Sequence, residues 1–334
     1  MNWLPFPDDR LELRGLQWFA EDGQTCRLPQ RIRERVPEPV WGLAQHTSGM
    51  RLRFATDSTS LGLRARFDAL PIMSNMPRTG QVGVDLYVDG QYWRPLYPEA
   101  TSTDFTGMFF EGLPRQRREV CLYFGLYAPI ELHALGFDDE ASFEAPAPFA
   151  LDKPVVYYGT SITQGGCATR AGMSYQAIVS RALNVDFVNL GFSGNGRGET
   201  VLAETIAEID AACYVMEWSQ NCPTLEEVRE RYGPFLQILR EQHPTTPIVC
   251  ITPIFGTNEE WGFNSHFAAM REIVSEAAGA RIAAGDAHLT LVEGLDLLGP
   301  ADREGLVDAV HPNDLGFLGM ARRLEPTLRR VLGL

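Results

Sequence analysis

The chain has 334 residues, of which 45% are hydrophobic and 22% are charged, and its formal net charge at pH 7 is −14. This length favours two domains over one, and this composition excludes a chain that is disordered throughout. The acidic balance argues against nucleic acid or an anionic membrane surface as a partner, because both need a basic footprint.

The N-terminus and the cysteines bear on the compartment. The first ten residues lack a basic segment followed by an apolar one, so no signal peptide is visible, and no apolar run is long enough to span a bilayer. The six cysteines are scattered, without a Cys-x-x-Cys pair or the spacing of a metal site. We therefore expect a cytoplasmic protein whose cysteines are free, buried thiols.

Residues 1–148 have the pattern of a β-rich domain. Short alternating runs occur at 50–54, 61–67 and 82–88. Turn signals occur at 77–80, 89–90 and 111–114. Many short strands with frequent turns predict an antiparallel β-sandwich or jelly roll.

Three tryptophans, Trp18, Trp41 and Trp93, fall in this half of the chain. They suit either a sugar-stacking platform or the core of the sandwich, and we favour core packing.

Residues 141–150 are rich in Ala and Pro and predict a linker between two domains, 1–148 and 149–334. After the linker, apolar strands alternate with amphipathic helices. The strands are expected near 154–158, 186–190, 213–217, 247–252 and 289–293. The helices are expected near 172–184, 199–209, 224–242, 264–283 and from about 313. This alternation predicts a flavodoxin-like, three-layer α/β domain with a five-stranded parallel sheet.

Ser161 follows a predicted buried strand. The β-branched and aromatic run 155–158 is too short for a helix and is ended by Gly159, and a helical pattern begins near Met173. A serine between such a strand and a helix lies beyond the carboxyl end of the strand, where open α/β sheets bind ligands. The hydroxyl can then face a substrate, and the alternative is a helix N-cap or an ordinary turn serine.

His311 suits the base that such a hydroxyl needs, because Asp308 lies three residues ahead of it to orient the ring. On a turn-like backbone this spacing lets the carboxylate face the imidazole. The pair follows the last predicted strand, so it falls on the same sheet edge as Ser161. Taken alone, an Asp-x-x-His pair is more often a surface or capping pair.

Two further stretches leave strands on that edge. The first, 190–196, contains Gly194 and supplies an N–H with no side chain in the way. The second, 218–221, supplies the carboxamide of Asn221. One such donor in an oxyanion hole contributes roughly 2.7–4 kcal/mol to a transition state. A glycine-rich turn and an Asx-turn are the alternatives.

Together these stretches resemble the SGNH (GDSL-type) serine hydrolase superfamily, in the same order along the chain. The four matching blocks are Gly159-Thr160-Ser161, 189–194, 217–221 and 308–312. The resemblance covers residues 154 to about 330 and implies the same five-stranded sheet. It implies Ser161 as nucleophile, with His311 and Asp308 completing the triad. It also implies an oxyanion hole made by the N–H groups of Ser161 and Gly194 and the amide of Asn221.

The β-rich half adds a second resemblance. Gly83-Val84-Asp85-Leu86-Tyr87 is similar to the Gly-x-Asp-Leu-Tyr motif of a domain found ahead of one branch of these hydrolases. Two departures leave the substrate class open. Thr160 stands where the namesake motif has Asp, and Cys222 follows Asn221 where Asp is common.

We therefore expect a serine esterase that hydrolyses carboxylic esters through an acyl-enzyme, without a metal or organic cofactor. By analogy with relatives that carry accessory β domains, the substrate would be a carbohydrate or small-molecule ester of acetate or another short acid. An acyltransferase with the same triad, a thioesterase or lipase for longer acyl chains, and a non-catalytic sugar-binding protein are the alternatives. Acyl length, the alcohol, regioselectivity and assembly into a homo-oligomer stay open.

Overall fold

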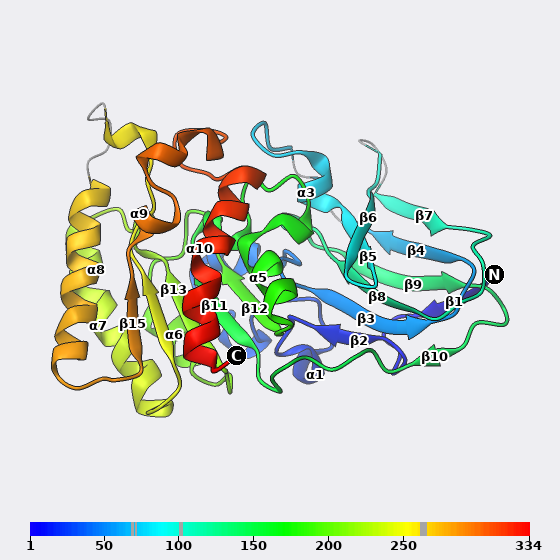
Figure 1. Ribbon diagram of the computed structural model, residues 1–334, viewed down its shortest axis with the longest axis horizontal. Helices are drawn as coiled ribbons and strands as arrows, with labels where there is room; N and C mark the ends of the chain where they lie inside the picture. Colours follow the sequence, from blue (N-terminus) through cyan, green and yellow to red (C-terminus); the bar gives the residue numbers. More distant parts are fainter. Residues whose placement is uncertain (68–69, 71, 100–102, 261–265) are drawn as a thin grey trace.

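The computed structural model describes residues 1–334 except 68–69, 71, 100–102 and 261–265. Two β-sheets lie side by side at one end of the molecule and an α/β unit lies at the other (Figure 1). Within the described residues, no helix combines the length and the apolar character needed to cross a membrane.

The first unit is an antiparallel β-sandwich, as the alternating runs predict. One sheet has the order β1-β9-β4-β7, with β1 at Asn2–Pro5, β9 at Glu131–Phe137, β4 at Leu61–Arg66 and β7 at Asp104–Phe110. The other has the order β10-β3-β8-β5-β6, with β10 at Phe143–Glu144, β3 at Arg51–Thr56, β8 at Arg118–Tyr123, β5 at Val84–Val88 and β6 at Gln91–Leu96. A further strand, β2 at Glu12–Arg14, pairs with β3. Apolar side chains from both sheets form one core between them.

The second unit contains the predicted five-stranded parallel sheet, in the order β12-β11-β13-β14-β15. The strands are β11 at Val155–Gly159, β12 at Phe187–Gly191, β13 at Cys213–Glu217, β14 at Ile248–Ile251 and β15 at Leu289–Val292. The helices are α4 at Ser161–Gln164, α5 at Tyr175–Leu183, α6 at Thr200–Ile206, α7 at Leu225–Gln242, α8 at His266–Ala283, α9 at Gly294–Leu297 and α10 at Asp314–Leu332. The predicted α/β fold is therefore confirmed.

Helices cover both faces of this sheet, because alternate residues of a strand face opposite sides. Val155 and Tyr157 pack with α5 and α10, whereas Val156 and Tyr158 pack with α6, α7 and α8. Burial on both sides explains why these strands are continuous apolar runs in the sequence. The first strand, β11, lies between β12 and β13, so its carboxyl end is flanked by two neighbouring turns.

A segment from the N-terminal half completes one face of the α/β unit. It contains α1 at Phe19–Asp22 and α2 at Glu38–Ala44, and Trp18, Ile32 and Val40 from this part of the chain join the core that α6, α7 and α8 form on the sheet. The guanidinium of Arg27 is fully buried and donates to the carbonyls of Asn189 and Gly191, at 3.2 and 2.7 Å. The chain therefore crosses from one unit to the other before residue 148.

The linker is held by both units. Within it, β10 pairs with β3, and Arg53 of β3 donates to the carbonyl of Ala147. On the α/β side, the Ala150 N–H donates to the carbonyl of Asn184 at 2.7 Å. These contacts leave residues 141–150 attached to the surface along their length.

Three details differ from the sequence prediction. Trp18 and Trp41, expected in the core of the sandwich, pack instead with the core of the α/β unit. The turn expected at 77–80 is instead the start of a short helix, α3 at Arg78–Val82, which Pro77 precedes with the extended backbone that suits a helix start. Trp93, expected in the core, is 42% exposed and stacks on Phe110 with the ring centroids 5.3 Å apart. The reason is that β6 is an edge strand, whose outer side chains meet solvent.

The two contrasting tryptophans test the role of the N-terminal segment. We expect Trp18→Ala to lower the free energy of unfolding by roughly 3–5 kcal/mol, because it opens a cavity in the core of the α/β unit. Trp93→Ala is the matched control and should cost about 1 kcal/mol or less, since it removes one exposed stacking contact. Urea unfolding followed by circular dichroism measures both. Equal losses in the two variants would contradict the proposed packing role of Trp18.

Candidate active site

Ser161 lies at the carboxyl end of β11, in a sharp turn between that strand and α4. Thr160 is the N-cap of the helix, and its hydroxyl accepts the N–H of Ile162 at 3.1 Å. Thr160 therefore caps the helix, and the Ser161 hydroxyl is not used as a cap. The Ser161 Oγ lies 2.9 Å from Nε2 of His311, in a cavity that the side chain shares with the turns after β12 and β13.

His311 is held from behind by Asp308. Its Nδ1 lies 2.9 and 3.1 Å from the two carboxylate oxygens, so the ring has its other nitrogen available to accept the Ser161 proton. The carboxylate also accepts the backbone N–H groups of Val310 and His311, at 2.9 and 2.8 Å. Partial burial alone would raise the pKa of Asp308, but the hydrogen bonds outweigh burial and lower the pKa to about 2. Asp308 is therefore ionised at neutral pH.

The predicted oxyanion donors face the same cavity, whose volume is about 320 Å³. Ser161, Gly194 and Asn221 all line it, together with His311. The Asn221 Oδ1 accepts the N–H of Gly196 at 3.1 Å, which turns the amide nitrogen away from that contact. Within the described part of the chain, the backbone N–H groups of Ser161 and Gly194 have no hydrogen-bond acceptor. The site thus has three donors that are free to bind a negatively charged oxygen.

Glu217 supports the nucleophile turn, residues 160–163, which carries the predicted nucleophile Ser161. It is not among the site residues that were predicted from the sequence. Its carboxylate is buried at the end of β13 and accepts the hydroxyls of Thr160 and Thr163, at 3.0 and 2.8 Å. Burial raises the pKa of Glu217 to about 7, and the hydrogen bonds offset only part of this rise. A charged residue at the end of a continuous apolar strand was the signal that could have identified it.

The sandwich unit also contacts the predicted catalytic residues. Asn75, in the loop before α3, donates its amide to Oδ2 of Asp308 at 3.0 Å. The Tyr127 hydroxyl lies 3.5 Å from the carbonyl of Ser161. No pattern in the sequence points to these contacts, because each joins two parts of the chain that are far apart.

One set of side chains near the triad has atoms that could bind a metal ion. Cys167, Asp308 and His311 offer ligand atoms within 4.8 Å of one another. Burial and the charge of Asp308 raise the pKa of the Cys167 thiol to about 12, which disfavours the thiolate that a metal needs. The carboxylate and the ring are also bonded to each other, so this arrangement favours a serine nucleophile over a metal centre.

Comparison with protein families gives two matches that together span most of the chain. A model of the GDSL-like lipase/acylhydrolase family matches residues 152–329, which is more than half of the chain. A model of the N-terminus of SGNH hydrolase-type esterases matches residues 1–143. A search of curated proteins finds no match.

Solved structures show the same architecture. A candidate GDSL-like lipase from Bacteroides ovatus is 28% identical, with a TM-score of 0.87 over 99% of this chain and 98% of that one. A salicylyl-acyltransferase from a tetracycline biosynthetic pathway is 22% identical, with a TM-score of 0.85 over 100% and 98% of the two chains. A family two carbohydrate esterase from Clostridium thermocellum, solved with cellohexaose, is 18% identical, with a TM-score of 0.66 over 86% and 93%. The last two likenesses concern the fold alone.

The buried Glu217 predicts how stability changes with pH. A glutamate in the unfolded chain releases its proton near pH 4.5, whereas the folded carboxyl keeps it up to about pH 7, so folding takes up a proton between these values. The free energy of unfolding should therefore fall as pH rises from 4.5 to 7. Replacing Glu217 by Gln should remove roughly 2–3 kcal/mol of that fall.

Denaturant unfolding at a series of pH values measures this difference. Glu304→Gln, at an exposed position, is the matched control and should leave the pH dependence unchanged. A Glu217→Gln curve that stays parallel to the wild-type curve would show that the folded carboxyl titrates normally.

Proposed function

The chain belongs to the GDSL-like lipase/acylhydrolase family and is a carboxylic ester hydrolase of the SGNH type, and from this premise we propose that Ser161 removes acetyl or another short acyl group from a carbohydrate or small alcohol. The proposal rests on the hydrogen-bond distances that join Ser161 to His311 and His311 to Asp308, with Ser161 and His311 lining the cavity. The cavity volume lies near the lower end of the range for small-molecule sites, which favours a short acyl group. Carbohydrate esterases share the fold, which supports a sugar as the alcohol.

The first half of the proposed reaction forms an acyl-enzyme. The Ser161 Oγ attacks the acyl carbonyl while Nε2 of His311 takes its proton. The negative charge that develops on the carbonyl oxygen is bound by the N–H groups of Ser161 and Gly194 and by the amide of Asn221. Collapse of this intermediate breaks the ester bond, and the departing alcohol takes the proton from His311. In the second half, water attacks the acyl group by the same route and releases the acid.

Two residues position these groups without touching the substrate. Asp308 holds the proton-bearing Nδ1 of His311 and stabilises the ring when it is charged. Glu217 joins the nucleophile turn to the end of β13, four residues before Asn221. We propose that the division at residue 148, which lies between the two matched ranges, separates units that act together, since Asn75 of the first unit contacts Asp308 of the second.

Hydrolysis of p-nitrophenyl esters from acetate to palmitate tests the proposed activity. We expect kcat/KM to be highest for acetate or another short acid and to fall steeply as the chain lengthens. Ser161→Ala should retain less than a few per cent of the wild-type rate with an unchanged circular dichroism spectrum. Preference for palmitate would instead indicate a lipase or thioesterase.

The acyltransferase alternative is separated by its product. With an added acceptor alcohol, an acyltransferase yields a new ester in place of free acid, and mass spectrometry of the products distinguishes the two. We expect free acid as the main product. This measurement is needed because an acyltransferase shares the fold over the whole of this chain.

Asn221 offers a direct test of the oxyanion hole. Asn221→Ala should lower kcat roughly 10²–10³-fold with little change in KM, because the lost hydrogen bond forms chiefly in the transition state. Asn221→Asp is the sharper variant, since it keeps the oxygen that accepts the Gly196 N–H and loses only the donor. It should be at least as slow as the Ala variant. A near-normal kcat for Asn221→Asp would assign Asn221 a role in the turn alone.

A further inference from the structure

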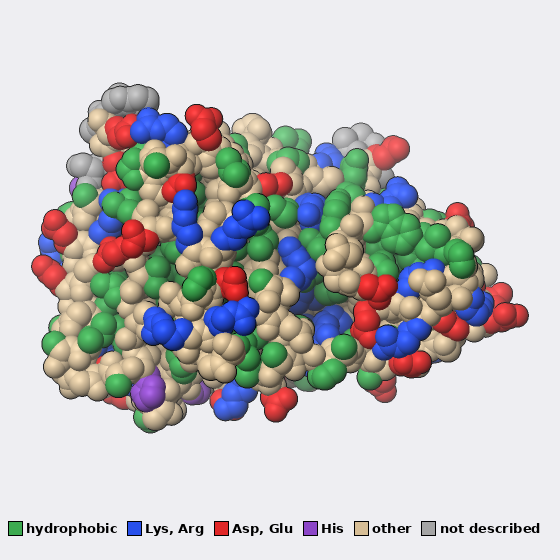
Figure 2. Space-filling model, in the orientation of Figure 1, with side chains coloured by type: hydrophobic (Ala, Val, Ile, Leu, Met, Phe, Trp, Pro, Cys, Tyr) green, Lys and Arg blue, Asp and Glu red, His purple; other side chains and the backbone are tan. Residues whose placement is uncertain are grey.

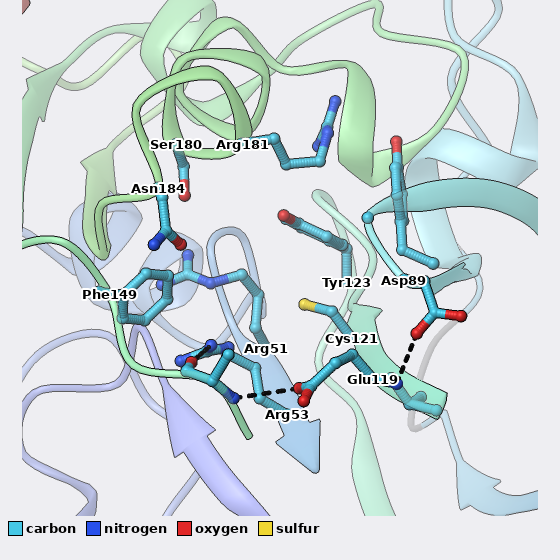
Figure 3. Close-up of a pocket in the computed structure, with 14 residues that line it drawn as sticks. Arg51, Arg53, Asp89, Glu119, Cys121, Tyr123, Phe149, Ser180, Arg181 and Asn184 are labelled. Carbon is cyan, nitrogen blue, oxygen red and sulfur yellow. Dashed lines mark hydrogen bonds between the residues drawn. The ribbon is translucent and has the colours of Figure 1, made fainter. Parts of the chain in front are cut away.

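A second cavity, of about 450 Å³, lies between the sandwich and the α/β unit (Figure 3). Its walls come from β3, β5 and β8, from the linker and from the C-terminal end of α5. It shares no lining residue with the catalytic cavity. The two cavities lie near opposite ends of α5, whose first residue, Tyr175, contacts Thr163 of the nucleophile turn. Basic side chains are visible in the hollow between the two units (Figure 2).

Two of the three arginines that line this cavity are already paired. Arg51 is buried, forms an ion pair with Asp186 and donates to the carbonyl of Phe187 at 2.8 Å. Arg53 forms an ion pair with Glu12 at 2.9 Å and covers the ring of Phe149 at 3.8 Å from the centroid. These two side chains build the wall of the cavity and need no outside anion.

The third arginine, Arg181, is different. It lies in the last turn of α5 and donates to the carbonyl of Gly172 at 2.7 Å, but in the described residues it has no carboxylate within ion-pair distance. One of its terminal nitrogens, Nη1, is buried and has no acceptor. Its guanidinium stands over the rings of Tyr87 and Tyr123, at 4.5 and 5.4 Å from their centroids. The carboxylate that interacts with it electrostatically, Asp85, is already paired with Arg170 at 3.3 Å, so Arg181 has no ion pair of its own among the described residues.

The remaining lining residues include three aromatic rings, the polar side chains of Ser180 and Asn184, and two carboxylates that already have hydrogen-bond partners. Tyr87, Tyr123 and Phe149 present rings, and Figure 3 shows the Tyr123 hydroxyl directed into the space below Arg181. Asp89 lies on the other side, where it accepts the N–H of Glu119 at 2.8 Å. Glu119 in turn pairs with Arg117 and accepts the N–H of Ala147 at 3.1 Å. A ligand that enters this cavity meets the guanidinium of Arg181 and the hydroxyl of Tyr123, with three aromatic rings in the walls.

We infer that this cavity is a binding site for a small aromatic carboxylate, which Arg181 and Tyr123 hold by its charge and the surrounding rings hold by its flat face. A carboxylate is attracted by the charge of the guanidinium, and a charge-assisted hydrogen bond in a partly buried site is stronger than a neutral one. The cavity volume lies within the range of small-molecule sites. The inference does not depend on the activity proposed for Ser161.

Calorimetric titration of the full-length protein with 2-naphthoate tests the site. We expect one molecule bound per chain, and binding of the neutral isostere 2-naphthamide weaker by roughly tenfold or more, because the amide lacks the charge. Arg181→Met keeps the apolar stem of the side chain and should weaken 2-naphthoate binding to a similar extent. Arg329→Met, which removes an exposed arginine of α10, is the matched control and should bind as the wild type does.

Hydrolysis of p-nitrophenyl acetate supplies a further readout, since Arg181→Met should leave the rate without naphthoate unchanged. If Arg181→Met melts at a lower temperature than the wild type, Tyr123→Phe replaces it and should weaken binding several-fold. Three results would overturn the inference. The first is undetectable binding of 2-naphthoate, and the second is equal binding of 2-naphthoate and 2-naphthamide. The third is competitive inhibition of hydrolysis by 2-naphthoate that neither variant weakens, because such inhibition would place the ligand in the catalytic cavity.

Discussion

The active site depends on the close approach of backbone turns at the carboxyl edge of the parallel sheet. A side chain at Gly159 would place its Cβ 2.4 Å from the carbonyl oxygen of Glu217, and one at Gly191 would place it 2.1 Å from the N–H nitrogen of Gln164. Only glycine lets the turn that carries Ser161 lie against both of its neighbours. The buried carboxylate of Glu217 then ties this turn to β13 through two threonine hydroxyls. The proposed nucleophile and the proposed oxyanion donors face one cavity because of this packing.

The two units of the chain are joined by packing and hydrogen bonds close to the proposed site. The N-terminal segment around Trp18 and Val40 covers one face of the catalytic sheet, and Arg27 fixes the end of β12. Asn75 reaches Asp308 across 233 positions of sequence. The sandwich thus contributes to the environment of the proposed triad, and the cavity around Arg181 lies where the two units meet. Removing either unit would change both sites.

Much of this arrangement could be predicted from the sequence, for physical reasons. Strands buried on both faces are continuous apolar runs, so the strand expected at 213–217 is found at Cys213–Glu217. The same logic placed Ser161 and His311 on one sheet edge, and the structure brings them within hydrogen-bond distance. The partner of an apolar side chain is not written in its pattern, so the contribution of Trp18 to the other unit could not be seen. Contacts such as that of Asn75 depend on loop geometry, which has no periodicity to read.

Labelling with a fluorophosphonate, followed by peptide mapping, would identify the nucleophile. Such a reagent reacts covalently with a serine whose hydroxyl is activated by a neighbouring base and whose product oxyanion is stabilised. We expect one label per chain, on Ser161, and loss of labelling when His311 is replaced by Ala. Labelling of another residue, or labelling of Ser161 that does not depend on His311, would contradict the proposed triad.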